Sequence, residues 1–119
     1  MNIAVAAEGE SLESEVSEEF SQCLYLLIVH MDDLTTTIIK TEETSPEYLA
    51  RKVLEFNCEA VITGEIDQAS FDIIADAQVT RYFGAGHSVK DALELSEKGL
   101  LKLIKDECSN HHHRDSLKC

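Results

Sequence analysis

Two glycines, a histidine and a serine stand together just before a stretch with the pattern of an amphipathic helix. The stretch reads RYFGAGHSVKDALE, from Arg81 to Glu94. Ser88 followed by Asp91 is a capping-box-like pair, because the serine oxygen can accept a free amide of the first helical turn. Gly84 and Gly86 suit a sharp turn, since glycine adopts positive φ without a steric penalty. A sharp turn into a helix therefore explains Gly84, Gly86 and Ser88 without a ligand.

The same turn also has the features of a ligand site. If it follows a parallel strand, the start of the helix offers amide groups and a positive dipole to an anion. His87 would add a ligand for a soft metal. The pattern is neither the dinucleotide-binding GxGxxG nor a Walker loop. We therefore keep two interpretations, a simple helix start and an anion site formed by Arg81, Gly84, Gly86, His87 and Ser88.

A second group of candidate ligands lies at the C-terminal end of the sequence. Cysteine thiolates and histidine imidazoles are ligands for zinc, copper and nickel. The spacing is not that of a zinc finger, and a segment without apolar periodicity must be ordered at a cost when it binds. We interpret residues 106–119 as a flexible tail that binds metal, either adventitiously or functionally, through Cys108, His111, His112, His113 and Cys119.

A third candidate is the run of six glutamates from Glu8 to Glu19. Such carboxylates can coordinate magnesium or calcium, but the ligand order of an EF-hand is absent. A solvated acidic surface, available to dock a basic protein partner, is the better interpretation.

The charge and composition limit the partners and the location of the protein. The net charge is −13, and residues 1–50 contain eleven acids and one base, Lys40. Such a surface repels phosphate backbones, which argues against nucleic acid as a partner. No apolar run reaches the roughly 20 residues of a membrane helix, and the N-terminus lacks the basic start of a secretory signal. We therefore expect a cytoplasmic protein without a membrane partner.

The hydrophobic patterns predict a single α/β domain over residues 1–105. Strands are predicted over 2–8, 23–31, 34–41, 60–64 and 79–84, with the second and third joined as an antiparallel hairpin. Helices are predicted over 45–57, 67–77 and 88–99, with caps at Ser45, Asp67 and Ser88. Residues 100–105 form either a short strand or a docked extension. Because strands and helices alternate in the second half, we expect right-handed crossovers and a mixed sheet of about five strands.

Four segments resemble, in their order and spacing, the nitrogenase iron-molybdenum cofactor-binding family, which includes the molybdenum–copper orange protein: NIAVAAEG, SEVSEEFSQCLYLLIV, AVITGEI and VTRYFGAGHSVKDALELSEKGLL. The resemblance implies a ribonuclease-H-like three-layer α/β/α fold with strand order 3-2-1-4-5 and strand 2 antiparallel. It also implies a protein that is not an enzyme. Such a protein binds, stores or delivers a sulfide-bridged cluster of molybdenum with copper or iron, which a protein partner donates or receives.

One position departs from that family. Its cofactor-carrying members have His-Phe-Gly before the second strand, with the histidine implicated in cluster binding, whereas this chain has Glu19, Phe20 and Ser21. A carboxylate is a poor ligand for a soft, anionic cluster. The resemblance therefore favours molybdenum with copper over the nitrogenase cofactor. Cys23 is the candidate replacement ligand, although a cysteine between apolar residues is also explained as a core residue.

Two alternatives to cluster handling follow from the sequence. The first is a ligand-free regulatory module that binds a protein partner through its acidic N-terminal face. The second is a nuclease that holds two metal ions on carboxylates at strand centres. The predicted strands NIAVAA, CLYLLIV and AVITG carry no acid at their centres, which argues against the nuclease.

Overall fold

The computed structural model describes residues 1–41 and 46–104. Three helices and six strands are found there, together with one short 3-10 helix, η1 (Phe20–Gln22). The strands are β1 (Asn2–Ala7), β2 (Tyr25–His30), β3 (Thr35–Lys40), β4 (Cys58–Thr63), β5 (Thr80–Phe83) and β6 (Lys102–Leu103). The helices are α1 (Pro46–Glu55), α2 (Gln68–Asp76) and α3 (Val89–Glu97). The predicted elements are therefore present, with ends shifted by a few residues.

The strands form one mixed sheet in the order β3-β2-β1-β4-β5-β6. β2 is antiparallel to both β1 and β3, whereas β4 is parallel to β1 and to β5. The predicted hairpin and the order of the first five strands are confirmed. The ribonuclease-H-like assignment that the resemblance implied stays a prediction.

The number of strands was predicted wrongly, because the sheet has six strands and not five. β6 is antiparallel to β5 and pairs Leu103 with Tyr82. The Ile104 amide donates to the Arg81 carbonyl at 2.8 Å, which continues the ladder. A strand of two residues leaves no alternation in the sequence, so its position depends on pairing with β5 and not on local propensity.

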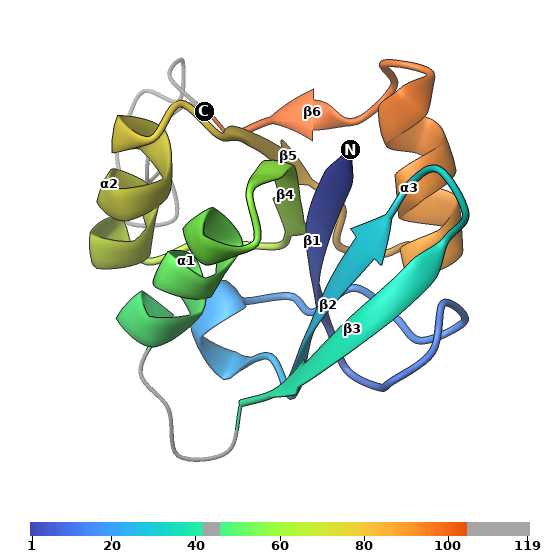
Figure 1. The fold of residues 1–119 in the computed structure, drawn as a ribbon, viewed down its shortest axis with the longest axis horizontal. Coiled ribbons are helices and arrows are strands. Elements are labelled where there is room, and N and C mark those ends of the chain that lie inside the picture. Colours follow the sequence, from blue (N-terminus) through green and yellow to red (C-terminus); the bar gives the residue numbers. More distant parts are fainter. Residues whose placement is uncertain (42–45, 105–119) are drawn as a thin grey trace.

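The helices cover both faces of the sheet, as Figure 1 shows, and make three layers. One hydrophobic cluster joins the sheet to α1 and α2, and contains Leu49, Val53, Phe71 and Ile74. A second cluster joins the opposite face to α3 through Val89, Ala92 and Leu93. The central strands are buried on both sides, which explains the continuous apolar run of β2.

The predicted helix caps are present where the structure describes them. An Asp67 carboxylate oxygen accepts the Ser70 amide at 3.0 Å, and the Ser88 hydroxyl oxygen accepts the Asp91 amide at 3.1 Å. Gly99 follows α3 with φ of 72°, the left-handed conformation of a helix C-terminus. The predicted cap at Ser45 lies outside the described residues.

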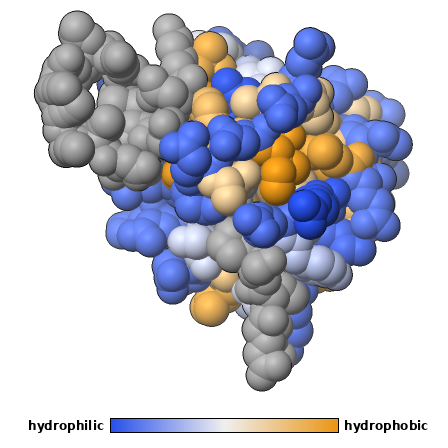
Figure 2. All heavy atoms as spheres, turned by 90° about the vertical axis from the view of Figure 1, so that its left-hand side faces the viewer, coloured by the Kyte–Doolittle hydropathy of each residue, from blue (hydrophilic) through white to orange (hydrophobic). Residues whose placement is uncertain are grey.

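The face formed by α1 and α2 is mostly hydrophilic, with apolar side chains near its centre (Figure 2). Among the described residues, no helix is long and apolar enough to cross a membrane.

Candidate binding site

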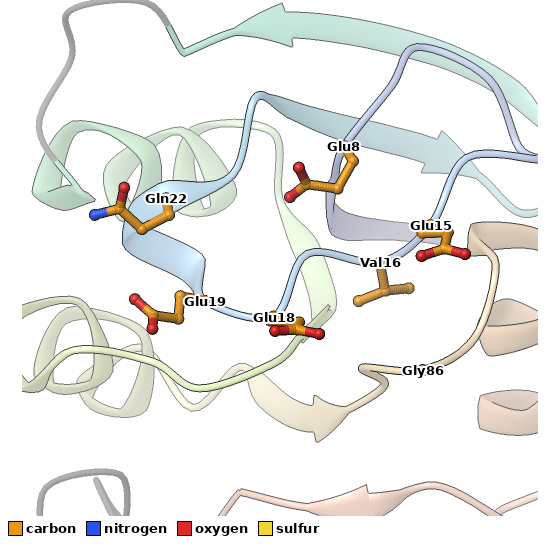
Figure 3. Close-up of a pocket in the computed structure, with 7 residues that line it drawn as sticks. All are labelled: Glu8, Glu15, Val16, Glu18, Glu19, Gln22 and Gly86. Carbon is orange, nitrogen blue, oxygen red and sulfur yellow. The ribbon is translucent and has the colours of Figure 1, made fainter.

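A shallow groove lies at the C-terminal ends of the parallel strands. It consists of two adjoining cavities of about 440 Å³ each, which share Glu18, Glu19 and Gly86. The remaining lining residues of the first cavity, drawn in Figure 3, are Glu8, Glu15, Val16 and Gln22. Those of the second cavity are Glu65, Phe83 and Ala85. Open α/β sheets commonly bind ligands at this edge.

The topology brings these side chains together. Glu8 follows β1, Glu65 follows β4 and Gly86 follows β5, and these three strands are parallel neighbours. The Glu18–Phe20 segment is hydrogen-bonded to Glu65, the second residue after β4. The Glu65 amide donates to the Glu18 carbonyl and the Phe20 amide to the Glu65 carbonyl, both at 2.7 Å. Five carboxylates therefore line the groove.

The loop between β1 and η1 occupies the start of α3. The Val89 amide donates to the Ser14 carbonyl and the Lys90 amide to the Leu12 carbonyl, each at 2.8 Å. The next amide, of Asp91, donates to the Ser88 hydroxyl oxygen. Ser88 is therefore a helix cap, and the first amides of α3 already have protein acceptors. The amides of Val89, Lys90 and Asp91 are therefore not available to the dipole-based anion site that the sequence suggested.

The glycines of the turn have different roles. A Cβ on Gly84 would lie 2.5 Å from Cγ2 of Ile62, so close packing on β4 requires glycine there. Gly86 has φ of 95° and open space where a Cβ would stand, and it lines both cavities. Within the described part of the chain, the amides of Ala85 and Gly86 have no hydrogen-bond acceptor. They are the donors that the turn leaves for a ligand.

Arg81 does not take part in this groove, contrary to the sequence-based set. It lies near the start of β5, at the opposite end of that strand from Gly86. Its guanidinium donates to the carbonyls of Val79 and Ile104, at 2.7 and 3.1 Å, and stacks 4.7 Å from the centre of the Phe71 ring. Burial lowers the pKa of Arg81. The residue therefore links β6 and α2 to β5.

The two soft ligands predicted near the turn are not presented to the groove. Cys23 is only 4% exposed and belongs to the core cluster below α1. Burial, together with the nearby Glu8 carboxylate, raises the pKa of the Cys23 thiol to about 12. A protonated, buried thiol is a poor metal ligand. His87 is half-buried and lines neither cavity, and its carbonyl accepts the Val16 amide at 3.0 Å.

The carboxylates are spread around the groove and do not converge on one point, as Figure 3 shows for the first cavity. Glu8 is held by the Ser17 hydroxyl, which donates to its carboxylate. Over residues 1–41 and 46–104, no three His, Cys, Asp or Glu side chains are placed to hold a metal ion. The predicted ligands Cys108, His111, His112, His113 and Cys119 lie outside the described residues.

Sequence reasoning treated the glutamate run as a solvated surface and did not include it, or Glu65, in the predicted site. One signal could have found two of these residues. Glu8 and Glu65 each come at or just after the end of a buried parallel strand, in AVAAE and VITGE, as the glycine turn does after β5. Residues in these positions meet at the same edge of a sheet.

The chain is a small α/β domain with a groove at the carboxyl ends of its parallel strands. The family model described as dinitrogenase iron-molybdenum cofactor matches residues 1–99, and the chain therefore belongs to this family. The family is of a cofactor-binding or accessory type and not a catalytic one. No curated protein matches the chain.

Solved structures with the same fold include three proteins of low sequence identity. The apo orange protein from Desulfovibrio gigas has a TM-score of 0.78 and 18% identity, covering 88% of this chain and 93% of that protein. A NifB-like protein from Thermotoga has a TM-score of 0.74 and 17% identity, with 96% and 98% covered. A dinitrogenase-like protein from Methanocaldococcus jannaschii has a TM-score of 0.70 and 23% identity, with 89% and 96% covered.

Proposed function

We propose that this protein binds a metal cluster or its precursor, and stores it or delivers it to a partner protein, without catalysing a reaction. The family match over residues 1–99 supports this proposal, and so does the similarity in fold to the orange protein. The family match is the observation that carries the proposal, because the groove at the carboxyl ends of the parallel strands offers few ligands of its own: among the described residues, two of its amides, of Ala85 and Gly86, have no acceptor. The proposed cargo is molybdenum bridged by sulfide to copper or iron.

The groove residues do not fit an anionic cluster on their own. Two like charges about 7 Å apart repel by roughly 0.6 kcal/mol in water, and by more where the site is partly buried. Each carboxylate at about this distance from a dianion would therefore oppose it by about 1 kcal/mol before screening by salt, and the five glutamates of the groove all act in the same direction. Two backbone amides contribute about 1–3 kcal/mol each at best. The amides at best offset this repulsion, so net binding of an anionic cargo needs soft ligands from another part of the chain.

We propose that the tail provides those ligands. Cys108, His111, His112, His113 and Cys119 combine thiols and imidazoles within twelve residues. Thiols and imidazoles are better ligands for copper and iron than the carboxylates of the groove are. His87 follows Gly86 in the sequence and is proposed as a further imidazole ligand, although it lines neither cavity.

Anaerobic reconstitution with tetrathiomolybdate and copper tests the proposal. We expect the full-length protein to become coloured and to retain molybdenum and copper in stoichiometric amounts after desalting. A chain truncated after residue 107 should lose most of this metal. If the full-length protein stays colourless and metal-free, the proposed function is wrong. If the truncated chain binds as much metal as the full-length chain, the assignment of the ligands to the tail is wrong.

A second candidate function is favoured by the charge of the groove. Five carboxylates and the Phe83 ring, which is 41% exposed, suit the cationic and apolar parts of a basic protein segment. In this case the chain would be a ligand-free interaction module that uses its acidic face. Hexalysine is a suitable probe. We expect it to bind the wild type and to bind a Glu18→Gln/Glu19→Gln/Glu65→Gln variant more weakly. Equal binding to both would exclude the groove as the site of a basic partner.

A further inference from the structure

Among residues 1–41 and 46–104, no strand pairs with the outer edge of β3. β3 is the last strand on one side of the sheet, and its register with β2 is continuous from Thr35 to Lys40, without a bulge. The residues Leu34 to Ile39 include no charged side chain and no proline. Charges, prolines and bulges are the usual means by which edge strands avoid pairing with another chain. The opposite edge is protected differently, because β6 has only two residues and one of them is Lys102.

The direction of the free backbone groups follows from the hydrogen bonds at the end of the strand. The Thr41 amide donates to the Leu24 carbonyl of the β2 side at 3.2 Å. Because amides along a strand alternate in direction, those of Thr37 and Ile39 also face β2. The amide and carbonyl groups of Thr36 and Ile38 therefore face outwards.

Apolar side chains accompany this free edge. Ile38 is 44% exposed, although it pairs with the fully buried Leu27 of β2. Leu34, in the turn before β3, is 49% exposed. Covering these side chains would contribute favourably, since burial of apolar area stabilises association.

The charges at the two ends of β3 are opposite, and this favours a second copy of the strand in the antiparallel orientation. Asp32 and Asp33 precede the strand and Lys40 ends it. A second copy of β3, placed antiparallel and centred on Thr37, would set Lys40 of each copy beside the aspartates of the other. The same arrangement would pair the outward groups of Thr36 with those of Ile38 in the other copy. Parallel pairing would place like charges together.

We propose that this protein forms a two-fold symmetric homodimer through antiparallel β3–β3 pairing, which joins the two sheets into one. The interface consists of one strand from each copy, and is therefore small compared with that of a permanent dimer. It forms reversibly. Each copy carries a net charge of −13, so the copies repel each other and added salt strengthens the dimer.

Sedimentation velocity over a concentration series tests the proposal on the full-length protein. We expect a concentration-dependent dimer that becomes more populated as sodium chloride is raised from 50 to 500 mM (about a threefold change in screening length). Ile38→Lys places a charge on the pairing edge and should weaken the dimer about tenfold or more. Leu103→Lys, a matched change at a half-exposed position of the opposite edge, should leave the dimer unchanged.

Amide hydrogen exchange provides a readout that does not depend on a variant. The amides of Thr36 and Ile38 should become protected as the protein concentration rises, whereas those of Thr37 and Ile39 should be protected at every concentration. A wild type that is monomeric at millimolar concentration would overturn the proposal. So would a dimer that is unaffected by Ile38→Lys, or one in which the Thr36 and Ile38 amides stay unprotected.

Discussion

Replacement of Gly64 by alanine should detach the acidic segment that forms the groove. A Cβ at this position would lie 2.0 Å from the Glu18 carbonyl oxygen and 2.4 Å from its carbon. The contact is with backbone, so no side-chain rotation relieves it. Gly64 is not one of the two glycines with positive φ. The cost of the substitution therefore comes from this contact and not from backbone strain at Gly64.

The expected destabilisation comes from the hydrogen bonds that the acidic segment loses and from the overpacking that the added Cβ causes. Moving Glu18 away breaks its hydrogen bond with the Glu65 amide and strains the one from Phe20 to Glu65, each 2.7 Å long. Two such bonds contribute about 1 kcal/mol each, and overpacking of a filled site adds about 1–3 kcal/mol. We expect Gly64→Ala to lower the free energy of unfolding by about 3–5 kcal/mol, or the melting temperature by more than about 10 °C.

Urea denaturation and amide exchange measure the two parts of this prediction. Gly99→Ala is the control, because a Cβ there meets nothing within 4 Å and only its φ of 72° opposes alanine. The control should cost about 1–2 kcal/mol and leave the Phe20 and Glu65 amides protected. In Gly64→Ala those two amides should exchange rapidly. A cost below about 0.5 kcal/mol with both amides still protected would refute the reasoning, since that is the range of an ordinary surface change.

Further predictions concern a helix cap and a buried thiol. Asp67→Ala removes the acceptor of the Ser70 amide and should lower the free energy of unfolding by about 1 kcal/mol in urea denaturation, whereas the exposed neighbour Gln68→Ala should change it little. Cys23 should react with iodoacetamide at pH 8 far more slowly in the native state than in urea, and equal rates would contradict its burial. Its folded pKa of about 12 lies above the ordinary 9.0, so its contribution to stability is complete below pH 9 and is lost as the pH rises towards 12. Cys23→Ala should show a smaller alkaline loss when unfolding is measured from pH 8 to 11, and the remaining loss comes in part from Cys58, whose pKa burial raises to about 11.

The fold could be predicted wherever the signal was local. β2 is a continuous apolar run because both of its faces are covered, and the helix starts at Asp67 and Ser88 follow from side chains that cap the next turn. The sequence left residues 100–105 open between a short strand and a docked extension, because the two residues of β6 form a strand only through their pairing with β5.

The position of the groove was predictable, whereas its lining was not. The carboxyl edge of the sheet follows from the strand order, and Gly86 lies there as the sequence suggested. The glutamates reach the same edge through contacts distant in sequence, such as those from Leu12 and Ser14 to the amides of α3. Arg81 was assigned to the turn because of its proximity in sequence, but β5 carries it to the far end of the strand.

The acidity of the groove also distinguishes the two candidate functions, because added salt should change the affinities for an anionic cluster and for a basic segment in opposite directions. Repulsion between the groove carboxylates and an anionic cluster weakens as salt is added, since the screening length falls to about 8 Å at 0.15 M. Binding of tetrathiomolybdate in the groove should therefore become tighter with salt, and Glu18→Gln/Glu19→Gln should remove much of that dependence. Attraction to a basic segment is screened in the same way, so hexalysine should bind less tightly with salt.

Metal binding by the tail alone should respond little to the same two substitutions. Isothermal titration at 50, 150 and 500 mM sodium chloride (about a threefold range of screening length) measures these slopes. A tetrathiomolybdate affinity that falls with salt and is unchanged by the glutamine substitutions would contradict binding of the anionic cluster among these carboxylates.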